Sequence, residues 1–212
     1  MPSLRAIALN PNYSDAHMMY GYELMLLGRF DDSRPYMQRA LDLDPLSIVK
    51  VISIGNVPYF QRDYESARGV YQQALEMDQN SGLAHWSLGN SLLATRRYAE
   101  AIREFEKAIA LSGDSPDEPA SLGLAYALSG NETGARKIIK ALDERSGRIY
   151  IPPSLAASIH GALGERDQAF ELLEQAFRDR DSLLAYLKVD PMFDPLRDDA
   201  RFAGYLSRLG LN

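Results

Sequence analysis

Residues 82–115, GLAHWSLGNSLLATRRYAEAIREFEKAIALSGDS, decide the fold. Apolar residues recur three and four positions apart in both halves, which predicts two amphipathic helices joined by a tight turn. Gly89 in the first half and Ala101 and Ala108 in the second half are small, so the two helices can pack closely together. A single pair of this kind leaves one apolar face uncovered, and it therefore needs a similar pair as its neighbour.

Similar copies follow one another along the chain without a break in phase. One position recurs every 34 residues and holds glycine four times and alanine once: Gly21, Gly55, Gly89, Gly123 and Ala157. Another position of the same register holds only small residues: Ser33, Ala67, Ala101, Ala135 and Ala169. We therefore divide this part of the chain into five repeat units, 14–47, 48–81, 82–115, 116–149 and 150–183.

The repeat resembles the tetratricopeptide motif, which has the same period and the same small residues. The residues that match the motif best are Leu88-Gly89, Ala101-x3-Phe105 and Asp44-Pro45. The motif's first aromatic position departs from the pattern, since it holds His17, Val51, His85, Pro119 and Pro153. The resemblance covers nearly the whole chain. It implies an all-α, right-handed superhelical solenoid of antiparallel helix pairs, in which the first helices line a concave face.

The two ends of the chain do not complete a unit. Residues 1–13 are in register with the end of a second helix, so they represent a partial helix of a preceding repeat. We expect either a piece of a longer polypeptide or a short helix that is itself a cap, because an uncovered repeat exposes an apolar edge. At the other end, residues 184–212 carry Phe202, Tyr205 and Leu206 on one side of a last helix. We expect this helix to cap the fifth unit.

From Glu165 onward the chain also resembles the C-terminal arrays of bacterial tetratricopeptide regulators. The residues that carry this resemblance are Tyr186-Leu187-Lys188-Val189-Asp190-Pro191 and Phe193-Asp194-Pro195-Leu196-Arg197. In such proteins the array often follows a winged-helix, nucleotide-cyclase or serine/threonine-kinase domain. The resemblance therefore implies an arm of a larger bacterial signalling or regulatory protein, in the cytoplasm.

Composition restricts the partners. The chain is 46% hydrophobic and 25% charged, and its net charge of −6 argues against binding of nucleic acid by this segment. It has no cysteine, which excludes disulfides, thiolate metal sites and cysteine nucleophiles. No apolar run approaches the roughly 20 residues that a membrane-spanning helix needs, so we expect no membrane partner.

A catalytic function has no support in the pattern of residues. The three histidines, His17, His85 and His160, fall on the first helices of different units, and stacking keeps such residues apart. No glycine-rich phosphate loop is present, because Gly89-Asn90 lies inside a helix and no lysine follows at the required spacing. We predict no enzyme, no metal and no cofactor.

A binding surface remains. By register, the resemblance places nine residues in the concave groove: Met18, Tyr22, Met25, Ile52, Asn56, Tyr59, Trp86, Asn90 and Leu93. Such apolar and aromatic residues suit an apolar segment of a partner protein or peptide. The amides of Asn56 and Asn90 suit the backbone of that segment. Two alternatives apply to these residues: the asparagines merely repeat a consensus position, and the aromatic residues form core between first helices.

One mode of binding known in the family is excluded. The carboxylate clamp, which grips the C-terminal acid of a peptide, needs lysine or arginine on the concave face. The corresponding positions here hold Met18, Ile52, Ser53, Leu83 and Ser87. The sequence therefore predicts a protein–protein interaction module with an apolar groove. Self-association as a homo-oligomer is the first alternative, and binding of a small molecule is the last.

Overall fold

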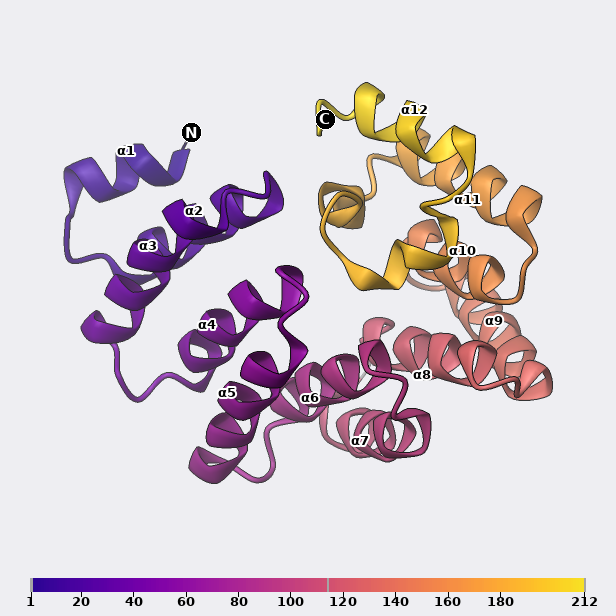
Figure 1. Cartoon of the computed structure of the whole chain (residues 1–212), viewed down its shortest axis with the longest axis horizontal. Helices are drawn as coiled ribbons and strands as arrows, with labels where there is room; N and C mark the ends of the chain where they lie inside the picture. The colour runs from indigo at the N-terminus through magenta and orange to yellow at the C-terminus, as the bar shows by residue number, and fades with distance from the viewer. Residues whose placement is uncertain (1, 114, 212) are drawn as a thin grey trace.

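The computed structural model describes residues 2–113 and 115–211, and within them every regular element is a helix. The helices are α1 (Pro2–Leu9), α2 (Ser14–Leu26), α3 (Phe30–Leu43), α4 (Ile48–Phe60), α5 (Tyr64–Met77), α6 (Gly82–Ala94), α7 (Tyr98–Leu111), α8 (Asp117–Leu128), α9 (Glu132–Ser146), α10 (Pro153–Ala162), α11 (Arg166–Asp179), the 3-10 helices η1 (Ser182–Tyr186) and η2 (Pro191–Leu196), and α12 (Ala200–Arg208). Figure 1 shows the helix pairs following one another around an arc. The predicted all-α, right-handed superhelical solenoid is confirmed.

The recurring glycines lie where the two helices of a pair come closest. A Cβ atom placed on Gly89 would lie 2.6 Å from the ring of Phe105, and one placed on Gly55 would lie 2.6 Å from the ring of Tyr71. Real side chains do not approach so closely, and therefore only glycine lets these rings pack against the first helix. On the second helices the small residues, such as Ala101, are completely buried.

The turn inside each pair requires a residue with a left-handed backbone. The first, fourth and fifth pairs use Gly28, Gly130 and Gly164, whose φ angles are 79°, 84° and 79°. In the second and third pairs the same position holds Arg62 and Arg96, with φ angles of 70° and 61°. A non-glycine residue incurs a steric cost of roughly 1–2 kcal/mol in this conformation. The geometry of the turn is therefore the same in every pair, although the sequence is not.

The last helix, α12, packs on α11 through apolar side chains. Phe202 and Tyr205 of α12 are buried in one cluster with Phe170 and Leu173 of α11. The rings of Phe170 and Tyr205 stack with their centres 5.8 Å apart. The last helix thus covers the final repeat pair, as the sequence predicts.

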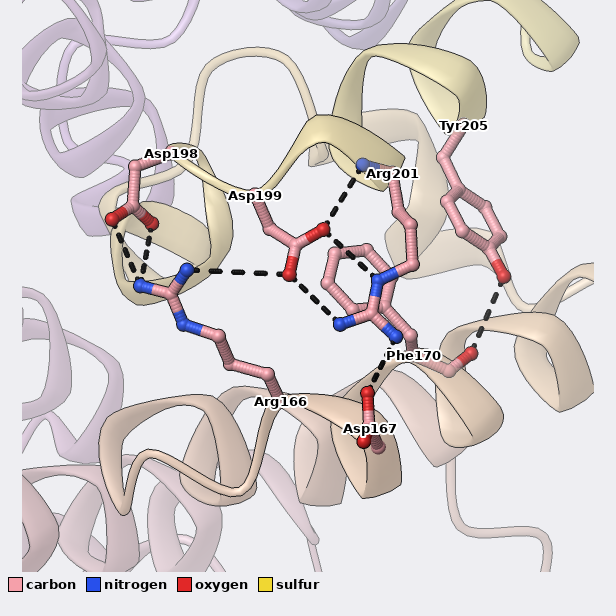
Figure 2. Close-up of polar contacts among 7 residues, drawn as sticks. All are labelled: Arg166, Asp167, Phe170, Asp198, Asp199, Arg201 and Tyr205. Atoms are coloured by element: carbon pink, nitrogen blue, oxygen red, sulfur yellow. Dashed lines mark hydrogen bonds and ion pairs between the residues drawn. The ribbon is translucent and has the colours of Figure 1, made fainter.

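Charged residues surround this apolar contact, as Figure 2 shows. Arg166 of α11 pairs with Asp198 at 2.8 Å, and Arg201 of α12 pairs with Asp167 of α11 at the same distance. The guanidinium of Arg201 also lies over the ring of Phe170, 4.2 Å from its centre. Such largely exposed pairs each contribute little to stability, and they connect α11 with α12 and with the residues just before it.

The first helix, α1, is held on α2 and leaves part of its surface uncovered. The buried Ser3 hydroxyl donates a hydrogen bond to Glu23 of α2. Leu9 at the end of α1 is 79% exposed, and Leu4 and Met19 are also exposed. This end of the molecule therefore presents apolar side chains to solvent. None of the described helices has the length and the apolar character that crossing a membrane requires.

Candidate functional site

A cavity of about 250 Å³, named here the central cavity, lies on the concave side of the solenoid. The first helices of all five pairs, α2, α4, α6, α8 and α10, contribute side chains to it. The remaining wall comes from α5 and from the C-terminal segment, which we define as residues 182–196. The concave surface is therefore shared by the whole array, and the chain itself covers part of it.

Six of the nine groove residues assigned from the sequence line the central cavity: Tyr22, Ile52, Asn56, Tyr59, Trp86 and Asn90. Leu93 lines a neighbouring cavity instead, together with Tyr59 and Asn90. Met18 is partly buried and packs against the core without lining either cavity. Met25 has no exposed surface, so its assignment to the groove is wrong. Its side chain faces the other helices of the array, and a partner cannot contact it.

Asn56 is occupied by the protein's own side chains. The hydroxyl of Tyr71 donates to Asn56 Oδ1 at 2.7 Å, and Asn56 Nδ2 donates to the hydroxyl of Tyr22 at 2.8 Å. The Tyr22 hydroxyl also lies 3.1 Å from Ser53 Oγ. Burial raises the pKa of both tyrosines, which keeps the hydroxyls neutral. The Asn56 side chain therefore links α2, α4 and α5. The side-chain amide of Asn90, by contrast, makes no hydrogen bond within the described residues.

Trp86 presents its ring to the central cavity and anchors its polar edge. Its Nε1 donates to Ser121 Oγ of α8 at 2.9 Å. The side chain is partly buried, so one part of the indole stays open to a ligand. A fixed aromatic ring in a concavity is a typical anchor for a binding partner.

Asp190 is the most unusual group at the site. It lies just before η2, its Oδ1 accepts a hydrogen bond from the backbone of Met192 at 2.8 Å, and it lines the central cavity. Burial raises the pKa of its carboxyl to about 6. Burial likewise raises the pKa of Tyr186 to about 12 and that of Tyr59 well above its ordinary value. The cavity therefore combines a weakly solvated carboxylate with neutral phenols.

Long-range contacts hold the C-terminal segment (residues 182–196) against the opposite end of the array. Arg62, in the turn of the second pair, donates through Nη2 to Asp194 Oδ1 at 2.8 Å. Lys188 Nζ donates to the carbonyl of Leu27 at 3.3 Å. These partners are 132 and 161 residues apart in the chain. The segment thus bridges the concave side from the last pair to the first two.

Sequence reasoning missed this wall of the cavity. The sequence analysis assigned residues 184–212 to a C-terminal cap and placed none of them in the groove, yet Met192 lines the central cavity, whereas Phe193 is completely buried. Tyr186 lies against Phe60 of α4, with ring centres 5.9 Å apart. Such contacts cannot be predicted from a local sequence pattern. In the repeats, the constant spacing indicates which residues are in contact, but this segment lies outside the repeats.

The three histidines lie on three different helices, α2, α6 and α10. Within residues 2–113 and 115–211 no three His, Cys, Asp or Glu side chains come together in a way that could hold a metal ion. His85 and His160 instead contact carboxylates of Glu104 and Glu165, in each case at 2.6 Å from Nδ1. Their role in the described structure is to join helices.

Comparison with known proteins agrees with this architecture. The family model for the tetratricopeptide repeat matches residues 4–48 and 54–118. No curated protein sequence matches the chain.

Among the solved structures that are similar to this chain, we describe three. A thermophilic tetratricopeptide protein from Thermus thermophilus is 17% identical, with a TM-score of 0.64 over 92% of this chain and 98% of that one. The APC/C hetero-tetramer Cut9–Hcn1 is 14% identical, with a TM-score of 0.67 over 97% of this chain and 44% of that one. MamA protein is 21% identical, with a TM-score of 0.50 over 82% and 94%. Because the family model covers more than half of the sequence and the repeated helix pairs stack as that family requires, the chain belongs to the tetratricopeptide repeat family.

Proposed function

We propose that the chain is a protein–protein interaction module that binds an apolar segment of a partner protein or peptide on its concave face. The observation that carries this proposal is a continuous apolar trough. The central cavity and a neighbouring cavity of about 360 Å³ share four lining residues: Tyr59, Asn90, Leu124 and Met192. Together they offer a longer site than a compact ligand needs, and a concave apolar surface of this kind suits a protein segment.

Trp86 provides the test, because it is the only tryptophan of the chain. Peptides selected by display on the folded protein are titrated while the tryptophan emission is recorded, and we expect a spectral shift on binding. Trp86→Ala should weaken binding of the selected peptides by more than about 1 kcal/mol, measured by calorimetry because this variant has no tryptophan. Tyr150→Ala is the matched control, since Tyr150 is an exposed aromatic residue that lines neither cavity. Equal affinity of the Trp86→Ala variant, with its fold intact by circular dichroism, would remove the trough as the site.

Self-association is a second candidate function, favoured by the exposed apolar residues near α1. Leu4, Leu9 and Met19 all lie on the surface there. A second copy could cover them, because repeat arrays bury their terminal faces on a cap or a neighbour. Light scattering over a dilution series measures the oligomeric state, and Leu9→Glu should shift a concentration-dependent oligomer to monomer. A mass that stays monomeric at all concentrations would contradict this candidate.

The wider context of the module is also a proposal. We place the array in a larger cytoplasmic bacterial signalling or regulatory protein, in which it follows a winged-helix, cyclase or kinase domain. We also propose the division into a partial helix (1–13), five repeats (14–183) and a C-terminal cap (184–212), and a non-catalytic role for the whole. The resemblance of the C-terminal sequence supports the first proposal, and the helix bounds support the second. The gene sequence upstream of Met1 tests the first directly.

A further inference from the structure

We propose that the central cavity takes a cationic group carried on an apolar body, an organic ammonium or guanidinium ion, with Asp190 as its counter-ion. This inference rests on the same site as the proposed function and adds the chemistry of what enters it. It follows from three observations: the charge of the lining, the aromatic residues around it, and the polar atoms there that lack a partner.

The charge of the lining is entirely negative. Two carboxylates, Asp117 and Asp190, line the central cavity, and no lysine or arginine among the described residues does so. The guanidinium groups of Arg62 and Arg197 lie close enough to act on Asp190, but both are bonded to Asp194 outside the cavity. Asp190 therefore faces the cavity without a positive partner inside it, and a weakly solvated carboxylate in this state favours a bound cation.

Aromatic rings form much of the remaining wall. Six of them line the cavity: Tyr22, Tyr59, Phe60, Tyr71, Trp86 and Tyr186. The face of an aromatic ring is negative and attracts a cation within about 6 Å of the ring centre, most strongly for tryptophan and where water is excluded. Rings of this kind also cover the apolar part of an amine. The negative faces of these rings give an anionic ligand no comparable attraction.

Several polar atoms at the cavity lack a protein partner. Asp190 Oδ1 accepts the Met192 amide, but Oδ2 accepts no hydrogen bond within the described residues. The hydroxyls of Tyr59 and Tyr186 likewise form none there, although Tyr59 is only 7% exposed. These three atoms keep some accessible surface, and each can accept a hydrogen bond from a ligand that carries several N–H donors. A primary ammonium group or a guanidinium group supplies them.

The volume limits the size of the ligand. About 250 Å³ suits a small organic amine or one long basic side chain rather than a large cofactor. The same cation could therefore come from a free amine or from a lysine or arginine of the partner segment. The chemistry is common to both sources, and the experiment separates them.

The test compares 2-phenylethylamine with 2-phenylethanol, a neutral molecule of nearly the same shape. Both are titrated into the full chain at pH 7.5 by calorimetry and by Trp86 emission. We expect the amine to bind at least about tenfold more tightly than the alcohol, because only the amine can pair with the carboxylate. Equal binding of the two molecules, or binding of neither, would overturn the inference without any variant.

Two variants locate the effect. Asp190→Asn keeps an oxygen that can accept the Met192 amide but removes the charge, and it should reduce affinity for the amine about tenfold while leaving the alcohol unchanged. Asp31→Asn is the matched control, since that carboxyl is 96% exposed and lies away from the cavity. Loss of amine binding in both variants alike, or in neither, would contradict a role for Asp190 as the counter-ion.

A second experiment, with peptides, separates this inference from the proposed function. Each apolar peptide that binds the trough is compared with versions that carry lysine or norleucine at its centre. A lysine preference that Asp190→Asn abolishes supports a side chain as the source of the cation. Amine binding without peptide binding supports a free amine and contradicts the proposed function. Peptide binding with no preference for lysine and no amine binding leaves the proposed function standing and overturns the inference.

Discussion

The repeat array, α2 to α11, and the C-terminal segment (residues 182–196) are held by different kinds of contact. In the array, apolar residues pack against the next helix along the chain, as Gly89 does against Phe105. The C-terminal segment packs buried apolar side chains, among them Leu187, Phe193 and Leu196, on the last pair. It reaches the first two pairs, 132 and 161 positions away, through charged side chains and a backbone carbonyl, and through the contact of Tyr186 with Phe60. Apolar contacts therefore hold the array together and anchor the segment on the last pair, whereas half-exposed polar contacts contribute much of its attachment to the first two pairs. We expect the attachment to the first two pairs to open more easily than the array unfolds.

The largest effect on stability is expected for a substitution that disrupts the packing of the array. Gly89→Leu should destabilise the protein by about 3 kcal/mol, because a side chain at this position collides with the completely buried Phe105. Gly69→Ala is the control: a Cβ there meets nothing within 4 Å, so we expect a gain of about 0.5–1 kcal/mol from helix propensity. Urea denaturation measures both. A neutral Gly89→Leu would show that the helices of a pair can separate at no cost.

The array could be predicted from the sequence because each of its contacts repeats. Gly55 and Gly89 stand at one register, and the rings that cover them, Tyr71 and Phe105, stand 34 residues apart as well. Six of the nine groove residues followed from the same register. Met25 did not, because a position on the inner helix can face either the groove or the adjacent helix, and periodicity does not distinguish these directions.

The other wall of the cavity could not be predicted. In the sequence, Asp190 is simply the residue ahead of a proline, and nothing in its neighbourhood marks it as a carboxylate that lines a cavity. Which residues lie next to Asp190 depends on the curvature of the solenoid, because the C-terminal segment crosses the concave side. That curvature is the sum of many small rotations between successive repeats. The same applies to Asp194 and Arg62, whose pairing closes the concave side.

An intermediate effect concerns Asp190 and pH. Burial raises the pKa of its carboxyl to about 6, compared with about 3.9 in an unfolded chain. Between these two values the folded state holds a proton that the unfolded state has lost, so this group's contribution to stability falls as the pH rises from about 4 to 6. Above pH 6 the weakly solvated charge costs about 3 kcal/mol, because each unit of pKa difference corresponds to about 1.4 kcal/mol. The neighbouring charges, Arg62, Arg197 and Asp194, contribute smaller effects on this pKa.

The substitution Asp190→Asn removes that charge. We therefore expect the variant protein to be more stable than the natural protein at pH 7 and equally stable near pH 4. The measurement is the difference in unfolding free energy between the two proteins at each pH, which cancels the contributions of other carboxyl groups. Asp31→Asn serves as the control, because its exposed carboxyl should leave the difference flat. If the stability difference between the two proteins stays the same from pH 4 to pH 7, Asp190 is well solvated. Water would then fill the space between the array and the segment at this residue.

The smallest effect concerns the ion pair between Arg62 and Asp194. Their side chains are 37% and 45% exposed, so a double-mutant cycle with Arg62→Gln and Asp194→Asn should give a coupling of only about 0.5–1 kcal/mol. The pair between Arg97 and Glu100 has similar exposure, but it lies within one helical turn at the start of α7. Breaking that pair should change the global stability equally little, and it should leave the C-terminal segment untouched.

Hydrogen exchange distinguishes these two cases. Arg62→Gln should increase exchange in residues 182–196 while α4 and α6 keep their protection, whereas Arg97→Gln should not change the C-terminal segment. Such a result would mean that the segment opens on its own, because local opening costs less than global unfolding. Exchange that rises in the segment and in the array together would mean that the two form one cooperative unit. In that case the polar contacts would matter for the curvature of the whole solenoid, and a ligand would have to enter the cavity without displacing its C-terminal wall.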